Sequence, residues 1–214
     1  MRLSCFQILL ISISLICVVK PQARTALDKR RKFNAADFKF NLAGSKPNTN
    51  GTGGTGRRAS ITELPSLEGI GISNVLFHIE PCGINLPHIH PRATEMFYVV
   101  EGQFQTGFLE ENEGRLILND LVKGETTFFP KGLIHFEQNL GCKNAIFLSA
   151  FNHEDPGVVT LPNRLFEIPI QALTSSFNTT DADSLNQIKS KLVNNPSRGI
   201  GECRARCGLP PVPI

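Results

Sequence analysis

Two histidines separated by a single residue are the first side chains in this sequence that could do chemistry. His88 and His90 lie in the stretch 81–102, PCGINLPHIHPRATEMFYVVEG. Alternate side chains of a β-strand point to the same face, so both imidazoles would face one cavity and could bind one metal ion. A lone pair at this spacing is more often incidental than a ligand pair, so it does not establish a site by itself.

Glu95 and His135 could complete such a site, but they enter the candidate set only through the family resemblance given below. The turn-like segment 91–94 would return the chain so that Glu95 opens the next strand, and the stretch 124–139, GETTFFPKGLIHFEQN, places His135 between apolar neighbours. Three imidazoles and one carboxylate form a mixed nitrogen and oxygen set that suits manganese, iron or zinc. In an octahedral centre, four protein ligands leave two positions open to dioxygen, superoxide or a carboxylate.

The elements that must position these residues are predicted to be short strands. Runs of β-branched and aromatic residues alternate with Gly, Pro and Asn turns between residues 62 and 168, at 70–80, 95–101, 104–110, 126–130, 133–138 and 145–151. Strands at this spacing indicate a β-sandwich or barrel. Residues 168–177 and 182–193 have apolar side chains at helical spacing, and the second segment has an Asp start signal, so we expect two helices.

The amino-terminal stretch predicts secretion. Arg2 precedes an apolar run over 6–19 and then Lys20, which is typical of a signal peptide spanning 1–23. The run is shorter than the roughly 20 apolar residues that a membrane span needs. Residues 24–60 are expected to form a basic arm and a flexible loop rich in Gly, Asn and Thr. Asn50 and Asn178 lie in sequons and are candidates for glycosylation in an extracellular wall, coat or matrix.

Composition excludes several classes of protein. The 214 residues are 41% hydrophobic and 19% charged, which is ordinary for a globular chain that buries a core. Lys and Arg number 22 and Asp and Glu number 19, a net charge of +3. This charge is too small for phosphate neutralisation, so we expect neither a nucleic-acid partner nor a membrane partner.

The spacing of the two stretches resembles the two motifs of the cupin superfamily, in particular the germin, germin-like and spherulin proteins. The first motif, G-x5-H-x-H-x3,4-E-x6-G, matches with Cys82 in place of its opening Gly. The second motif, G-x5-P-x-G-x2-H-x3-N, matches in full. The matched positions are His88, His90, Glu95 and Gly102, then Gly124, Pro130, Gly132, His135 and Asn139. Cys82 and the carboxy-terminal cysteine pair resemble the spherulin type most.

The resemblance implies an all-β fold, a cupin β-jelly-roll barrel, over residues 61–168, with a C-terminal helical extension and a cysteine-containing tail over 169–214. It also implies one metal ion inside the barrel, usually manganese, with iron and zinc as alternatives. The implied ligands are His88, His90, Glu95 and His135. By strand alternation, Glu137 shares a face with His135 and is a candidate for orienting a ligand.

Two classes of function follow from the resemblance. Germin-like proteins imply superoxide dismutation or oxalate oxidation, and oxalate chemistry in germins uses two asparagines near the metal. Asn85 matches one of them and is a candidate substrate-pocket residue, but Val75 stands at the other position, and Asn74 should point to the opposite face. We therefore favour a superoxide dismutase-type oxidoreductase over an oxalate oxidase. The alternative is a non-enzymatic coat, matrix or storage glycoprotein with a structural metal; the barrel could also hold a small organic molecule.

Four cysteines remain beyond the predicted signal peptide, and an even number in a secreted chain indicates disulfides, here with three connectivities. In a jelly roll the strand of His88 lies antiparallel beside the strand of His135. This arrangement would place Cys82 and Cys142 at the same end, so we predict a Cys82–Cys142 bond and a local Cys203–Cys207 clip. The alternative for the second pair is a link between subunits or two free thiols.

The germin resemblance of the two carboxy-terminal helices also implies a homo-oligomer, either a dimer, a trimer or a hexamer. An apolar stripe formed by Leu185, Ile188 and Leu192 could serve that association. The same stripe could equally pack on the chain's own barrel.

Overall fold

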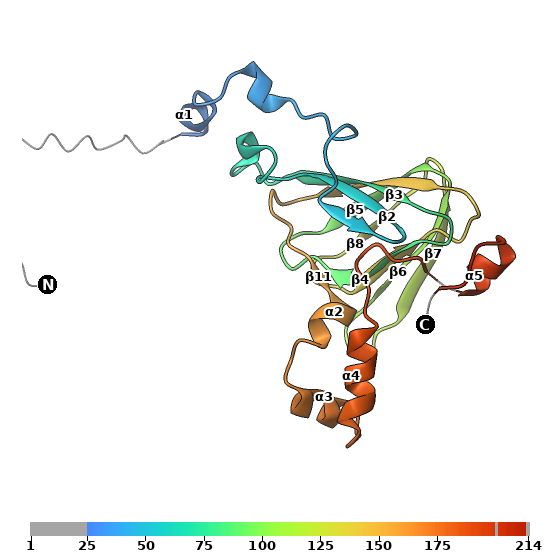
Figure 1. The fold of residues 1–214 in the computed structure, drawn as a ribbon. Coiled ribbons are helices and arrows are strands. Elements are labelled where there is room, and N and C mark those ends of the chain that lie inside the picture. Colours follow the sequence, from blue (N-terminus) through green and yellow to red (C-terminus); the bar gives the residue numbers. More distant parts are fainter. Residues whose placement is uncertain (1–24, 200, 213–214) are drawn as a thin grey trace, which may run out of the picture.

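The fold is a jelly roll of two antiparallel sheets, as the sequence motifs imply (Figure 1). The computed structural model describes residues 25–199 and 201–212, so the predicted signal peptide lies outside the described residues. One sheet has the order β1-β2-β3-β10-β5-β8 and the other β11-β4-β9-β6-β7. The strands are β1 Thr49–Gly51, β2 Gly54–Ala59, β3 Ser73–Ile79, β4 Ile84–Ile89, β5 Glu95–Glu101, β6 Gln103–Leu109, β7 Leu116–Val122, β8 Thr126–Phe129, β9 His135–Gln138, β10 Ala145–Phe151 and β11 Val159–Thr160.

Phenylalanine rings fill the space between the sheets. Phe97 stands at the centre of this core, with Phe147 at a ring-centroid distance of 4.7 Å and Phe104 at 5.6 Å. All three side chains are fully buried. Burial of each aromatic side chain removes roughly 150–250 Å² from water. This aromatic core therefore holds the two sheets together beside the cavity described below.

The amino-terminal boundary of the barrel differs from the sequence prediction. Residues 24–60 were expected to be an arm and a flexible loop, but β1 and β2 lie within them and extend the first sheet. Glycine is needed here because backbone or side-chain atoms of other segments approach closely. A Cβ on Gly53 would lie 1.7 Å from the carbonyl oxygen of Ser197, and one on Gly56 would lie 2.7 Å from the Phe77 ring. Strand β7 was also missing from the predicted strands, and its side chains alternate between exposed and half-buried.

The two predicted helices are present. Helix α3 spans Ile170–Ser176 and α4 spans Ala182–Ser190, and the side chain of Asp181 caps α4 by accepting from the Ser184 N–H. Leu173 and Leu185 pack with Phe166 in a small apolar cluster separate from the barrel core. Three short helices complete the described chain: α1 Ala26–Arg30, α2 Leu161–Leu165 and α5 Gly201–Arg206, with 3-10 turns at Ala35–Phe38 and Pro65–Leu67. No helix among residues 25–199 and 201–212 is long and apolar enough to cross a bilayer.

The disulfide pairing differs from the predicted one. Cys82 is bonded to Cys203 and Cys142 to Cys207, instead of Cys82 to Cys142 and Cys203 to Cys207. Cys82 and Cys142 do lie at the same end of the barrel, since the Cys82 N–H donates to the carbonyl of Gly141. However, Cys203 and Cys207 are spaced i, i+4 at α5, where Cβ atoms are roughly 5–6 Å apart. A disulfide needs about 3.8 Å between Cβ atoms, so each cysteine instead bonds to the barrel.

Candidate metal centre

Three neighbouring strand segments bring the candidate ligands together. His88 on β4 lies directly opposite His135, the first residue of β9, and their ring centroids are 4.2 Å apart. His90 follows the end of β4, and Glu95 opens β5 in the facing sheet. All four side chains are buried, with exposed fractions of 8% or less. The four predicted ligands therefore form one cluster whose ligand atoms lie within 4.8 Å of one another.

Backbone carbonyls fix the orientation of all three imidazoles. The Nδ1 atoms of His88 and His135 lie 2.8 Å from the carbonyl oxygens of Leu86 and Leu133, respectively, and Nδ1 of His90 contacts the carbonyl of Gly157. A carbonyl oxygen only accepts, so Nδ1 carries the proton in each ring and Nε2 keeps a lone pair. This is the tautomer that binds a metal through Nε2.

The carboxylate of Glu95 faces two of these nitrogens. Its Oε2 lies 3.1 Å from Nε2 of His90 and 3.3 Å from Nε2 of His135, while Oε1 accepts a hydrogen bond from the Ser149 hydroxyl. Oε2 of Glu95 and Nε2 of His135 are buried without a hydrogen-bond partner. Converging lone pairs without a proton between them repel one another, and a cation relieves this repulsion. The side chains therefore fit a metal ion.

Burial favours the neutral ring of His88. Burial, together with the neighbouring His135 and His90, lowers its pKa to about 3. Burial would raise the pKa of Glu95, but the nearby imidazoles of His135 and His90 outweigh it and lower that pKa. Near neutral pH the cluster thus offers a neutral His88 and an ionised Glu95, which are the forms that bind metals.

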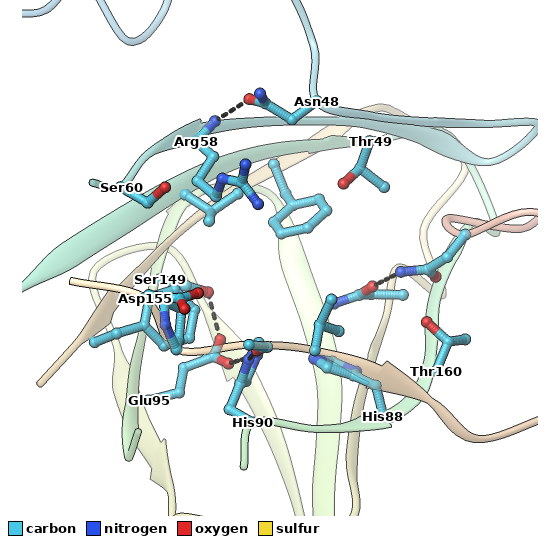
Figure 2. A pocket seen from close by; sticks show the side chains of 18 residues that line it. Asn48, Thr49, Arg58, Ser60, His88, His90, Glu95, Ser149, Asp155 and Thr160 are labelled. Carbon is cyan, nitrogen blue, oxygen red and sulfur yellow. Dashed lines mark hydrogen bonds and ion pairs between the residues drawn. The ribbon is translucent and has the colours of Figure 1, made fainter. Parts of the chain in front are cut away.

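The cluster lies at the bottom of a cavity of about 410 Å³. Figure 2 shows His88, His90 and Glu95 on one side and Arg58 and Asn48 across from them. Val75 and Phe77 contribute apolar side chains to the wall, and Asn85 lines it as the sequence predicted. Asn74 is absent from the lining. The wall therefore has one of the two asparagines expected of germin oxalate chemistry.

Asn85 belongs to a buried hydrogen-bond chain. Its Nδ2 donates to Oε2 of Glu137 at 2.8 Å, and its Oδ1 accepts from Nδ2 of Asn195. Glu137 is fully buried, and burial, followed by the charge of Glu95, raises its pKa well above the usual value. Asn195 had no sequence signal because it lies outside both motifs and reaches the cavity from the carboxy-terminal segment.

Arg58 is a second cavity residue that sequence patterns missed, because it lies in the segment expected to be a loop. Its Nε and Nη2 donate to Glu63 at 3.1 and 2.8 Å, and Ser60 donates to the same carboxylate. Burial would raise the pKa of Glu63, but the hydrogen bonds from Arg58 and Ser60 outweigh it and lower the pKa to about 2. The ionised carboxylate thus holds Arg58 in place across the cavity from the candidate metal ligands.

This lowered pKa gives a testable pH dependence. Glu63 contributes stability above pH 4.5, its ordinary pKa, and that contribution is lost as the pH falls towards 2. Glu63→Gln should therefore lower the free energy of unfolding at pH 7, with a difference from wild type that shrinks by pH 3. Urea unfolding at pH 7, 4 and 3 measures it. Glu68→Gln, at an exposed carboxylate, is the control, and a difference independent of pH would contradict the assignment.

Comparison with known proteins points to one group. A family model described as Cupin matches residues 40–183. Spherulin-1B of Physarum polycephalum is 39% identical over 188 residues, covering 87% of this chain and 76% of that protein. The rhicadhesin receptor of Pisum sativum is 40% identical over 166 residues, covering 74% of this chain and 75% of that protein.

A solved structure gives the same result for the fold. Recombinant oxalate oxidase in complex with glycolate superposes with a TM-score of 0.68 and 31% sequence identity. The match covers 74% of this chain and 82% of that one. The likeness thus extends over most of both chains.

Proposed function

Because this chain belongs to the cupin family, with spherulins and germin-like proteins among its relatives, we propose that it is a secreted, manganese-dependent oxidoreductase of the superoxide dismutase type. The observation that carries the proposal is the buried group of three Nε2 lone pairs and one carboxylate, of which His88, His90 and Glu95 line a cavity of about 410 Å³. Manganese follows from the germin resemblance of the ligand set, and such a mixed nitrogen and oxygen set suits that ion.

The bound metal would supply one-electron redox chemistry, and the chain supplies its environment. His88, His90, His135 and Glu95 would hold the ion, and backbone carbonyls and Ser149 fix their orientations. Val75 and Phe77 give the cavity an apolar wall. Burial raises the pKa of Glu137, whose carboxyl group accepts a hydrogen bond from Asn85. A reaction that turns a superoxide anion into peroxide consumes protons, so a buried carboxyl group with a raised pKa beside a cavity residue is consistent with this chemistry.

Oxalate oxidation is the less favoured activity, although an oxalate oxidase is among the similar structures. Val75 lines the cavity at the position where the germin resemblance expects a second asparagine. An isopropyl group cannot hydrogen-bond a carboxylate. Superoxide needs no such contact, so the lining favours dismutation.

The test is metal content and superoxide consumption of the protein purified from a secreting host grown with manganese. We expect about one manganese per chain and measurable dismutation in the wild type, and neither in His88→Ala. Equal dismutation rates for the two proteins would overturn the enzymatic proposal. A folded wild type without metal would favour the non-enzymatic coat, matrix or storage role.

We also propose that the protein is a glycosylated homo-oligomer. Asn50 and Asn178 are exposed, as an acceptor for a glycan must be. Met96 and Phe128 expose apolar side chains on paired strands β5 and β8, and Ile188 does so on α4. These faces would be covered by a second copy. The mass of the native particle, measured before and after enzymatic removal of N-glycans, tests both statements.

A further inference from the structure

The segment that follows α4 returns to the metal-binding strand. Residues 194–199, here called the C-terminal strap, run along the start of β4, where Ile84 and Ser197 exchange backbone hydrogen bonds of 2.9 Å in both directions. The Gly53 N–H donates to the carbonyl of Pro196, which is buried. Close contacts at Gly53 and Gly199 leave no room for a Cβ. The strap is therefore packed closely against the barrel, with Pro196 buried.

The strap donates and accepts hydrogen bonds at β4 where the pairing of β4 with β9 is interrupted. Strand β4 pairs with β9 at Asn85 and again at His88, with a register shift between them. Pro87 has no N–H to donate, and the N–H of Leu86 donates instead to Oδ1 of Asn195 at 2.7 Å. The carbonyl of Leu86 in turn accepts from Nδ1 of His88. One side chain of the strap thus supports the residue that orients a metal ligand.

The same side chain also fixes Asn85. Nδ2 of Asn195 donates to Oδ1 of Asn85, and Nδ2 of Asn85 donates to Glu137. Because its oxygen accepts from Asn195 and one of its N–H groups donates to Glu137, the orientation of the Asn85 amide is fixed, and its second N–H is left without either partner. The carboxamide of Asn195 thereby sets which group the neighbouring amide offers.

We propose that Asn195 is a positioning residue of the metal site, acting on His88 through Leu86 and on Asn85 directly. The inference rests on the metal centre proposed above. It concerns residues beyond 183, where the family match ends. The disulfide from Cys82 to Cys203 anchors the chain beyond the strap to the residue that precedes β4 by two positions, and so keeps Asn195 in register.

The experiment compares wild type with Asn195→Ala and with Asn194→Ala, a matched control at the exposed neighbouring position of the strap. Partners that orient metal ligands typically contribute a factor of about 10–100 in affinity. We expect Asn195→Ala to weaken Mn²⁺ binding by about 10-fold in a competition titration, while Asn194→Ala binds like wild type. Asn195→Ser removes the same carboxamide and serves as a second variant should the Ala variant not fold.

Two measurements on the metal-free protein separate this inference from the metal proposal. Faster hydrogen exchange at the Leu86 amide and a changed ¹⁵N shift of the His88 ring, both seen by NMR in Asn195→Ala alone, support the positioning role even if wild type binds no Mn²⁺. The role is overturned if the His88 ring shift is unchanged in metal-free Asn195→Ala. It is equally overturned if wild type and Asn195→Ala bind Mn²⁺ with the same affinity, because Asn195 then holds only the strap.

Discussion

Adding Mn²⁺ at about one thousand times its dissociation constant is expected to raise the free energy of unfolding by about 4 kcal/mol. The physical reason is that the ligand cluster exists only in the folded state, where unpartnered atoms of Glu95 and His135 face one another. His135→Ala should abolish the increase, because it removes the ligand that shares Oε2 of Glu95 with His90. Thermal or urea unfolding with and without the ion measures the effect.

The quantity to compare is the difference that Mn²⁺ makes within each variant. His135 also stacks on Phe129 with ring centroids 4.5 Å apart, so its loss lowers stability without any metal. His78→Ala is the matched control, since this half-buried histidine on β3 is not in the ligand cluster. A chelator should reverse the increase in wild type and in His78→Ala. An equal increase in His135→Ala would show that the ion binds elsewhere, and no increase in wild type would argue against the site.

The four candidate metal ligands were predictable from the sequence because the two stretches that resemble the cupin motifs place each of them by local spacing. His88 and His90 are two residues apart, and the proline- and glycine-containing turns before Glu95 and His135 fix where the next strands begin. The same applies to α4, whose Asp181 cap is a local signal. Features that depend on a few adjacent residues can therefore be predicted from the sequence alone.

Features that depend on distant segments were not predictable. Gly51 and Gly53 were interpreted as part of a loop, because the reason for glycine at these positions is the backbone of the C-terminal strap more than 140 residues away. Asn195 contacts Asn85 across 110 residues, and nothing in its sequence surroundings indicates a cavity. Antiparallel register correctly placed Cys82 near Cys142, but the arrival of α5 between them decided the bonding.

The disulfides carry the second large effect. Bonds between residues 121 and 65 positions apart should each stabilise the fold by about 4–5 kcal/mol in the chain-entropy model. The change must remove both cysteines of a pair. Loss of Cys203 alone would leave the Cys82 sulfur 3.7 Å from the sulfur of Cys207, close enough to exchange with the remaining bond. The variants are therefore Cys82→Ser with Cys203→Ser, and Cys142→Ser with Cys207→Ser.

Each double variant should lose most of that stabilisation, as measured by urea unfolding. The two variants should differ in how firmly the C-terminal strap is anchored, and therefore in Mn²⁺ affinity. Without the Cys82–Cys203 bond, the chain that follows Asn195 is no longer tied to the start of β4, so Mn²⁺ affinity should fall as in Asn195→Ala. Without the Cys142–Cys207 bond, the other anchor remains and Mn²⁺ affinity should change less. Digestion under non-reducing conditions checks the premise: a peptide linking Cys82 to Cys142 would contradict the pairing, because both variants would then carry unpaired thiols in place of one intact bond.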